Sequence, residues 1–428
     1  MSPRTVMSAV MLVALLIPAQ PARAEQAGAA VPVPAFYTPP ATLPAADGAL
    51  IRTEPLPLAL SLPGIDGTLP GRATRIMYKS TDSTGGPVAV TGAYLEPAAP
   101  WPAGGARPLV VLAPGTMGQG DQCSTSLALE RGLIIGTEND QLTLSVGYEV
   151  LAIYRLLIRG IAVVTTDYPG LGTTDRLHTY VNRVDSGHAV LDAARAARIL
   201  SGISSQPIGL YGYSQGGGAV ASAAELQATY APDVTVTAGY AGAPPADLAE
   251  VVGGIDGSEL AGALGWSING FAQSEPALRP ILDRYLSDAG QTALTRLSTM
   301  CVGDAILAYA GKRSSSWTVG GKSMTEVIAA EPALEEFITD QRIGTRRPSG
   351  VIRVATGVFD NLVPHAQARA MVADWCDRGG RVVYAPVVLP WSASPLLNHF
   401  GPLLSDQPLA VDWLGRRLAG SPATSNCP

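Results

Sequence analysis

Short runs of apolar and β-branched residues recur along the chain, and they constrain its fold more than any other feature. Several of these runs are apolar at every position, which is typical of parallel strands that helices cover on both faces. Helix-forming stretches lie between them, including the alanine-rich residues 183–201. The alternation predicts a doubly wound, mostly parallel α/β sheet. Its expected strands are residues 108–113, 161–166, 207–211, 234–240, 351–356 and 381–388.

The alternation is interrupted between residues 248 and 348, where helical patterns dominate and strand patterns are few. We expect this block to be an insertion that forms a helical cap over the carboxyl edge of the sheet. The core would then consist of residues 25–247 and 349–428, with a hairpin of residues 73–79 and 88–96 at one edge of the sheet. A separate helical domain is the alternative interpretation of the block.

The first 24 residues have the pattern of an export signal. Arg4 gives a basic start, residues 6–17 are apolar, and Ala22-Arg23-Ala24 fits a cleavage site. An N-terminal anchor that stays attached is the alternative. No later run reaches ~18 uninterrupted apolar residues, the length that a membrane span needs. The sequence therefore predicts a secreted protein whose signal peptide, residues 1–24, is removed.

Charge and composition exclude several classes of function. The formal net charge is −6, and removal of Arg4 and Arg23 with the signal would make it −8. This acidic balance argues against a nucleic-acid partner and leaves no basic face for anionic membranes. The four cysteines fit an oxidising compartment, where three pairings are possible. They lack metal-ligand spacing, and no H-E-x-x-H motif occurs, so we expect neither a metal nor an organic cofactor.

The segment GLYGYSQGGGAV, residues 209–220, carries the pattern G-x-S-x-G around Ser214. The pattern alone is weak in a chain with 47 glycines. Here, however, it follows a predicted strand and precedes a stretch of small, helix-forming residues. Strand, tight turn and helix are the context in which such a serine is exposed as a nucleophile. Ser214 is therefore the candidate nucleophile.

A nucleophilic serine needs a base, and the base needs a group that orients it. In this type of site the chain order is serine, acid, histidine, so only His365 and His399 qualify as bases. His399 lies beyond the last predicted strand, in an expected loop, and is the candidate base; a surface histidine is the alternative. Asp360 follows a predicted strand and is the candidate acid, unless it only caps a helix. His365 is expected to be structural.

An oxyanion requires two or more fixed N–H donors. Gln215, directly after the nucleophile, supplies one backbone N–H at the start of a helix. The other should come from the loop after the strand at 108–113, within Gly115 to Gln122. The glycines of this loop permit close approach of the backbone, although a plain flexible loop is the alternative.

Five segments carry recognisable motifs: GYSQGG at 212–217, DYPGLG at 167–172, GAPPADL at 242–248, TGVFDNLVP at 356–364 and NHFG at 398–401. In these motifs and their order the chain resembles the secretory lipase family of yeast and actinobacterial exported enzymes. The resemblance covers most of the mature chain. It implies an α/β-hydrolase fold with a helical cap that acts on carboxylic esters, with Ser214 as nucleophile, Asp360 as acid and His399 as base.

The same resemblance implies two further features. Asp121 matches an aspartate that helps to form the oxyanion hole of the family. Cys123 matches a cysteine bonded to the cap, here Cys301, which leaves Cys376 to pair with Cys427. Pro114-Gly115 stands where the family usually has a histidine and a glycine, so the resemblance does not identify the exact set of oxyanion donors.

The leading hypothesis is an exported esterase or lipase that acts by two-step acyl transfer on a small-molecule or lipid ester, with transient contact with a lipid surface. An exopeptidase or acyltransferase on the same fold is the second hypothesis, because amides and esters share a tetrahedral intermediate. A catalytically silent binding protein is the third. Residues 259–272 of the cap could line an acyl tunnel, but their apolar pattern also fits the core of the cap.

Overall fold

The computed structural model describes residues 31–60, 62–64, 67–138 and 141–427. The predicted export signal lies outside these residues. No helix among the described residues has both the length and the apolar character that a membrane crossing requires.

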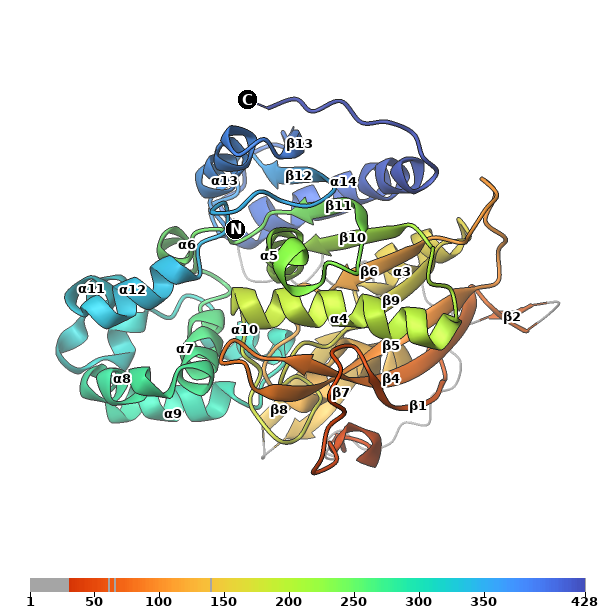
Figure 1. The fold of residues 1–428 in the computed structure, drawn as a ribbon. Coiled ribbons are helices and arrows are strands. Elements are labelled where there is room, and N and C mark those ends of the chain that lie inside the picture. The colour runs from red at the N-terminus through yellow and green to blue at the C-terminus, as the bar shows by residue number, and fades with distance from the viewer. Residues whose placement is uncertain (1–30, 61, 65–66, 139–140, 428) are drawn as a thin grey trace.

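A nine-stranded sheet forms the centre of the molecule (Figure 1). Its strand order is β1-β4-β5-β9-β6-β10-β11-β12-β13. Six adjacent strands run parallel to one another, namely β9, β6, β10, β11, β12 and β13. Strands β1, β4 and β5 form an antiparallel edge. The predicted doubly wound sheet and its edge hairpin are therefore confirmed. The strands are β1 (Leu50–Leu56), β4 (Gly71–Thr81), β5 (Pro87–Pro97), β6 (Leu109–Ala113), β9 (Ala162–Thr166), β10 (Ile208–Tyr213), β11 (Val236–Gly242), β12 (Val351–Gly357) and β13 (Arg381–Val387).

Helices cover both faces of this sheet and bury its side chains in two separate apolar clusters. One face packs against α4 (Arg183–Ser201), α5 (Gln215–Tyr230) and α13 (His365–Asp377). The other packs against α3 (Val150–Leu157) and α14 (Pro395–Leu418). The central parallel strands β6, β9, β10 and β12 are buried along their whole length, which explains why apolar residues dominate their sequences.

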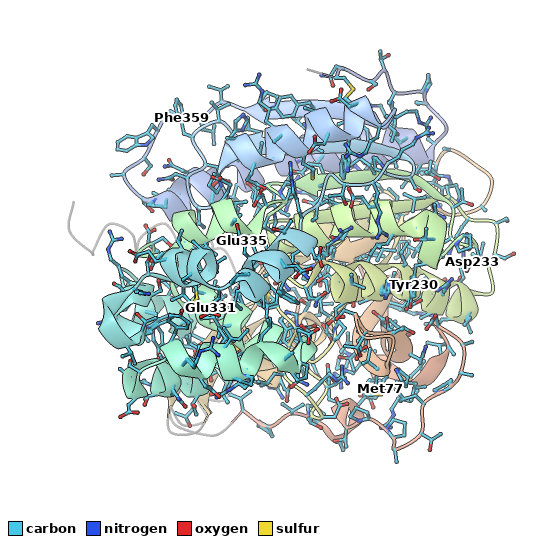
Figure 2. All side chains as sticks on the ribbon, turned by 60° about the vertical axis from the view of Figure 1, so that its left-hand side comes forward. Met77, Tyr230, Asp233, Glu331, Glu335 and Phe359 are labelled. Carbon is cyan, nitrogen blue, oxygen red and sulfur yellow. A yellow bond between two sulfur atoms is a disulfide. The ribbon has the colours of Figure 1, made fainter. Side chains whose placement is uncertain are left out.

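Residues 248–348 form short helices and no strand, and Figure 1 shows them gathered at one end of the sheet. They bury two apolar clusters of their own, and the first of these also takes in Leu362 and Val363 from the core. Ion pairs such as Arg284–Glu331 lie at the cap surface (Figure 2). The helices are α6 (Leu248–Ile255), α7 (Gly262–Ser274), α8 (Arg279–Tyr285), α9 (Asp288–Leu297), α10 (Val302–Tyr309), α11 (Met324–Ala330) and α12 (Pro332–Asp340).

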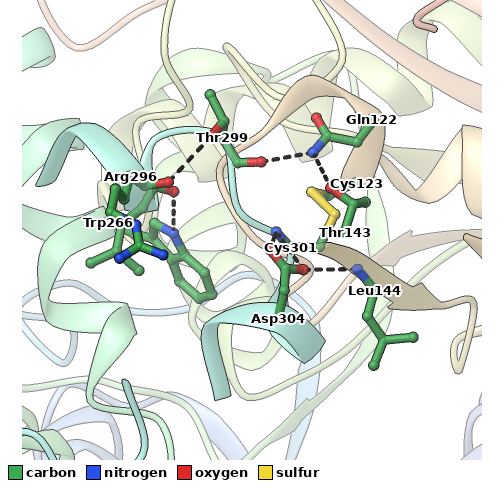
Figure 3. Close-up of a disulfide and its surroundings, with 10 residues drawn as sticks. Gln122, Cys123, Thr143, Leu144, Trp266, Arg296, Thr299, Cys301 and Asp304 are labelled. Atoms are coloured by element: carbon green, nitrogen blue, oxygen red, sulfur yellow. Dashed lines mark hydrogen bonds between the residues drawn. A yellow bond between two sulfur atoms is a disulfide. The ribbon is translucent and has the colours of Figure 1, made fainter. Parts of the chain in front are cut away.

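Two disulfides join distant parts of the chain. Cys123 is bonded to Cys301 and Cys376 to Cys427, the pairs that the family resemblance implies. The first ties the loop after β6 to the start of α10 in the cap (Figure 3). Beside it, Gln122 donates to the Thr299 carbonyl oxygen at 2.7 Å. The second disulfide holds the C-terminal tail against α13.

A two-stranded ribbon, β7 (Leu133–Glu138) and β8 (Gln141–Val146), lies outside the main sheet and was not expected from the sequence. Asp304 of α10 accepts a hydrogen bond from the Leu144 N–H at 2.9 Å, which ties the ribbon to the cap. A second short ribbon consists of β2 (Leu62–Gly64) and β3 (Gly67–Leu69).

Candidate active site

Ser214 occupies a strained turn between β10 and α5. Its backbone has φ 58° and ψ −123°, values that non-glycine residues rarely adopt. The turn is possible because its flanking residues lack side chains: a Cβ on Gly212 would lie 2.2 Å from the Gly216 oxygen, and one on Gly216 would lie 2.0 Å from the Ala113 oxygen. The turn leaves Ser214 partly exposed, whereas the residues on both sides of it are buried.

Asp360, beyond the carboxyl end of β12, and His399 form a buried pair. One carboxylate oxygen of Asp360 accepts the backbone N–H groups of Leu362 and Val363 at 3.1 and 3.0 Å. The other lies 2.7 Å from His399 Nδ1. Because an ionised carboxylate only accepts, this contact places the imidazole proton on Nδ1 and leaves the lone pair on Nε2. The pair has the geometry of an acid that orients a base.

The structure corrects the expected loop position of His399. This residue lies in the first turns of α14, which begins at Pro395 and is capped by the Ser394 hydroxyl. The sequence pattern missed this because prolines occur both at the start of the helix and inside it. Tyr213, next to Ser214, donates its hydroxyl proton to the His399 carbonyl oxygen at 2.7 Å, and the two rings lie 5.3 Å apart. This contact brings the helix to the serine turn.

His399 Nε2 is buried and has no hydrogen-bond partner in the described part of the chain. The Ser214–His399 hydrogen bond is thus not formed here. Such bonds are often long or poorly aligned without substrate and tighten when substrate binds. A buried basic nitrogen without a partner is costly, and at this place it is available to accept the proton of a nucleophile.

Gln215 is the first residue of α5, where a backbone N–H has no partner within the helix. This agrees with its expected part in an oxyanion hole. The expectation for Gly115 needs correction, because its N–H donates to Glu149 Oε1 at 2.8 Å and is not free for a substrate. In this loop it is Thr116 that lines the cavity beside Ser214, and no acceptor for the Thr116 N–H lies among the described residues.

Asp121 also needs correction as an oxyanion residue. It opens a short 3-10 helix, Asp121–Cys123, and is not among the described residues that line the Ser214 cavity. The chain between Thr116 and Asp121 turns away to pair with the cap, where Gln119 N–H donates to the Met300 carbonyl oxygen at 3.0 Å. Matching a residue by motif position alone could not reveal this turn.

A largely apolar cavity extends from Ser214 into the cap. Five members of the segment 259–272 line it, while Trp266 is fully buried in the apolar core of the cap. The segment therefore lines the cavity and also forms part of the apolar core of the cap. The aliphatic and aromatic lining consists of Val181, Pro245, Leu248, Val251, Val252, Ile255, Leu260, Ala263, Leu264, Phe271, Ile338, Leu362 and Val363, and the polar lining of Thr116, Tyr180, Ser214, Gln215 and Ser267.

His178 was set aside on chain order, yet it lies directly behind the serine turn. Its Nδ1 is 3.1 Å from the Pro169 carbonyl oxygen and its Nε2 is 2.9 Å from Gln215 Nε2. Nδ1 therefore carries the proton and Nε2 accepts from the Gln215 amide. Burial lowers the pKa of His178 to about 4, so this histidine stays neutral and fixes the Gln215 side chain. The sequence offered no spacing pattern that would have identified it.

Among the described residues, no group of three or more His, Cys, Asp or Glu side chains is arranged to hold a metal ion.

Known proteins resemble this chain over most of its length. The family model described as secretory lipase matches residues 136–426. A probable inactive lipase of Mycobacterium tuberculosis is 28% identical over 400 residues, 91% of this chain and 83% of the relative. Lipase 10 of Candida albicans is 24% identical over 408 residues, which cover 92% of this chain and 82% of that relative. Candida antarctica lipase A in its closed state has a TM-score of 0.75 at 19% identity over 93% of this chain and 89% of that one, which supports the predicted α/β-hydrolase fold.

Proposed function

The chain belongs to the secretory lipase family, and on that basis we propose that it is an exported serine esterase or lipase acting through an acyl-serine intermediate on carboxylic esters of the acylglycerol type. The observation that carries the proposal is the open Nε2 of a buried, aspartate-held His399 beside the strained Ser214 turn. The resemblance-based assignment of Ser214, Asp360 and His399 thus gains support from geometry.

The mechanism follows from the atoms that are available. Ser214 Oγ attacks the ester carbonyl carbon while His399 Nε2 takes the hydroxyl proton. Asp360 stabilises the imidazolium through Nδ1, and the backbone N–H groups of Gln215 and Thr116 receive the oxyanion. His399 then gives its proton to the departing alkoxide, which leaves as alcohol. Water repeats the sequence on the acyl-serine and releases the acid.

The cavity lining favours esters of aliphatic acids over peptides. It contains hydroxyl and amide groups but no charged side chain among the described lining residues. An exopeptidase must recognise the charged end of a peptide, and a charge buried without an opposite partner is strongly disfavoured. An acyl chain needs only apolar contact, which this lining supplies.

Export is part of the proposal. Membership in a secretory family and two disulfides support an extracellular location. Cleavage after Ala24 is inferred from the sequence alone. A water-insoluble ester is reached at a lipid surface, so the proposal includes transient contact with such a surface.

A silent binding protein is the second candidate, because one relative is named a probable inactive lipase. The experiment that separates the two is labelling of the purified mature protein with a serine-reactive fluorophosphonate, followed by mapping of the adduct by mass spectrometry. We expect an adduct on Ser214 that disappears in His399→Ala. A folded protein that forms no adduct, and hydrolyses neither acyl esters nor peptide amides, would favour the binding protein.

A further inference from the structure

Glu149 is a buried carboxylic acid that the mechanism above does not use. It immediately precedes α3, and only 4% of the residue surface is exposed. Its Oε1 accepts the Gly115 N–H at 2.8 Å. Gly115 is adjacent in the chain to Thr116, whose backbone N–H is the second oxyanion donor in the proposed mechanism. The buried acid therefore holds the backbone N–H of the residue that directly precedes the proposed oxyanion donor.

Other side chains hold the same loop at adjacent atoms. Tyr168 donates its hydroxyl proton to the Pro114 carbonyl oxygen at 2.7 Å. Tyr148 donates to the Thr116 carbonyl oxygen at 3.2 Å. The Thr116 hydroxyl lies 2.7 Å from the hydroxyl of Tyr180. Glu149 alone in this set accepts a hydrogen bond from a loop N–H, so only its removal leaves a buried backbone donor unpaired.

We propose that Glu149 is a positioning residue for catalysis: its carboxyl group fixes the Gly115 peptide and thereby aims the Thr116 N–H at the oxyanion. This inference rests on the proposed function. The loop packs too closely for the position to be adjusted in other ways, because a Cβ on Gly115 would lie 2.5 Å from the Tyr148 hydroxyl. A donor in an oxyanion hole stabilises the transition state only when it is held at the right distance.

Among the described residues, no cation contributes to the pKa of Glu149. Burial raises its pKa to about 7, and the Gly115 N–H opposes this shift. The titratable groups that face it are tyrosines: burial, and then the charge of Glu149, raises the pKa values of Tyr148, Tyr168 and Tyr211. Burial of a carboxyl group disfavours its ionised form, so its presence at this position indicates a role beyond packing.

The test compares kcat and KM for a soluble chromogenic ester in the mature protein and its variants. Glu149→Met keeps the size and removes the acceptor, and kcat should fall about 10- to 100-fold with KM nearly unchanged. Glu149→Gln keeps the acceptor and should restore kcat to within about threefold of the wild type. Asp192→Asn alters another buried acid, one bonded to Ser80 and Tyr230 away from the cavity, and should leave kcat unchanged.

A second readout comes from stability against pH. The folded pKa of Glu149 exceeds its ordinary value, so the folded state favours the protonated acid, and that stabilisation is lost as the pH rises through about 7. Glutamine does not ionise. The melting temperature of Glu149→Gln minus that of the wild type should therefore increase as the pH is raised from about 5 to about 8.

Unchanged kcat in Glu149→Met would overturn the inference. If that variant does not fold, Glu149→Asp decides, because it withdraws the acceptor by one methylene; it should lower kcat about tenfold, and wild-type kcat would again overturn the inference. A wild-type protein without a Ser214 adduct or esterase activity would instead contradict the proposed function, so the two failures are distinguishable.

Discussion

The core and the cap both contribute to the Ser214 cavity, but different forces hold their atoms in place. In the core, the turn around Ser214 is set by backbone approaching backbone, and Gly212 and Gly216 have no room for a Cβ. In the cap, Gly253 of α6 is exposed, and a Cβ there would meet nothing within 4 Å. Backbone contacts thus fix the serine turn, whereas this exposed position of the cap has room for a side chain.

The helices of the cap are short, and several of them are capped by a side chain. Asp247 caps α6, Ser287 caps α9 and Ser323 caps α11, each through its own side chain. One disulfide, Cys123–Cys301, fastens this set to the loop after β6. Changes beside the serine turn of the core should therefore alter kcat, and changes in the cap should alter KM or stability. The predictions below test that division, beginning with the largest effect.

The first prediction concerns the acid that orients His399. Asp360→Asn should lower kcat by a factor of about 10⁴, because an amide at this place favours the wrong imidazole tautomer. The melting temperature should change little, since the side chain keeps its size. Asp283→Asn makes the same chemical change in the exposed Arg279–Asp283 pair of the cap and should leave kcat unchanged. Equal activity of Asp360→Asn and the wild type would remove Asp360 from the site.

The second prediction compares a glycine-to-alanine substitution in the core with one in the cap. Gly216→Ala should lower the free energy of unfolding by at least about 3 kcal/mol and abolish activity, because the new Cβ would lie 2.0 Å from the Ala113 oxygen. Gly253→Ala should raise the free energy of unfolding by about 0.5–1 kcal/mol, because alanine favours a helix interior. Urea unfolding measures both. A tolerated alanine at Gly216 would contradict the view that backbone contacts fix the turn.

Much of the core could be predicted from the sequence because burial on both faces leaves a strong pattern. The runs at 108–113 and 351–356 became β6 and β12 with boundaries shifted by one residue at most. The turn of Ser214 was predictable for the same reason, since a strand, glycines and a helix all have local signatures. Residues 183–201 became α4 with the same bounds.

The second layer of the site could not be predicted in this way. Glu149 reaches Gly115, and His178 reaches Gln215, only after separate strands have been placed side by side. Neither contact has a sequence spacing, and an isolated glutamate or histidine carries no local pattern. His399 was placed in a loop because prolines in α14 hide the helix. The ribbon β7–β8 was missed because it lies outside the main sheet.

The third prediction compares the two disulfides. Replacing Cys123 and Cys301 with serine should lower the free energy of unfolding by about 2–5 kcal/mol and raise KM, because this bond fastens the cap beside the cavity. The Cys376–Cys427 disulfide closes a shorter loop, with a sequence separation of 51 residues against 178. Its replacement with serines should therefore lower the free energy of unfolding by about 1 kcal/mol less. KM should stay constant in the second variant, since that bond holds only the tail. A KM shift from the tail bond alone would break the division.

The smallest effects are expected from single helix caps. Ser323→Ala removes the capping hydroxyl of α11, which accepts the Glu326 N–H at 3.3 Å, and should lower the free energy of unfolding by about 1 kcal/mol. Asn182→Ala removes the cap of α4 in the core, which accepts the N–H groups of Val184 and Asp185 at 3.0 and 3.2 Å.

Asn182 is 1% exposed, so water cannot easily replace its amide, and the loss there should reach about 2 kcal/mol. The cap of α11 lies nearer to solvent, and water can take its place. Neither variant should change kcat, because neither residue lines the cavity. If urea unfolding shows equal losses for the two variants, burial does not make a helix cap in the core more stabilising than one in the cap region. The contrast between core and cap would then be confined to the glycine turn and the disulfide.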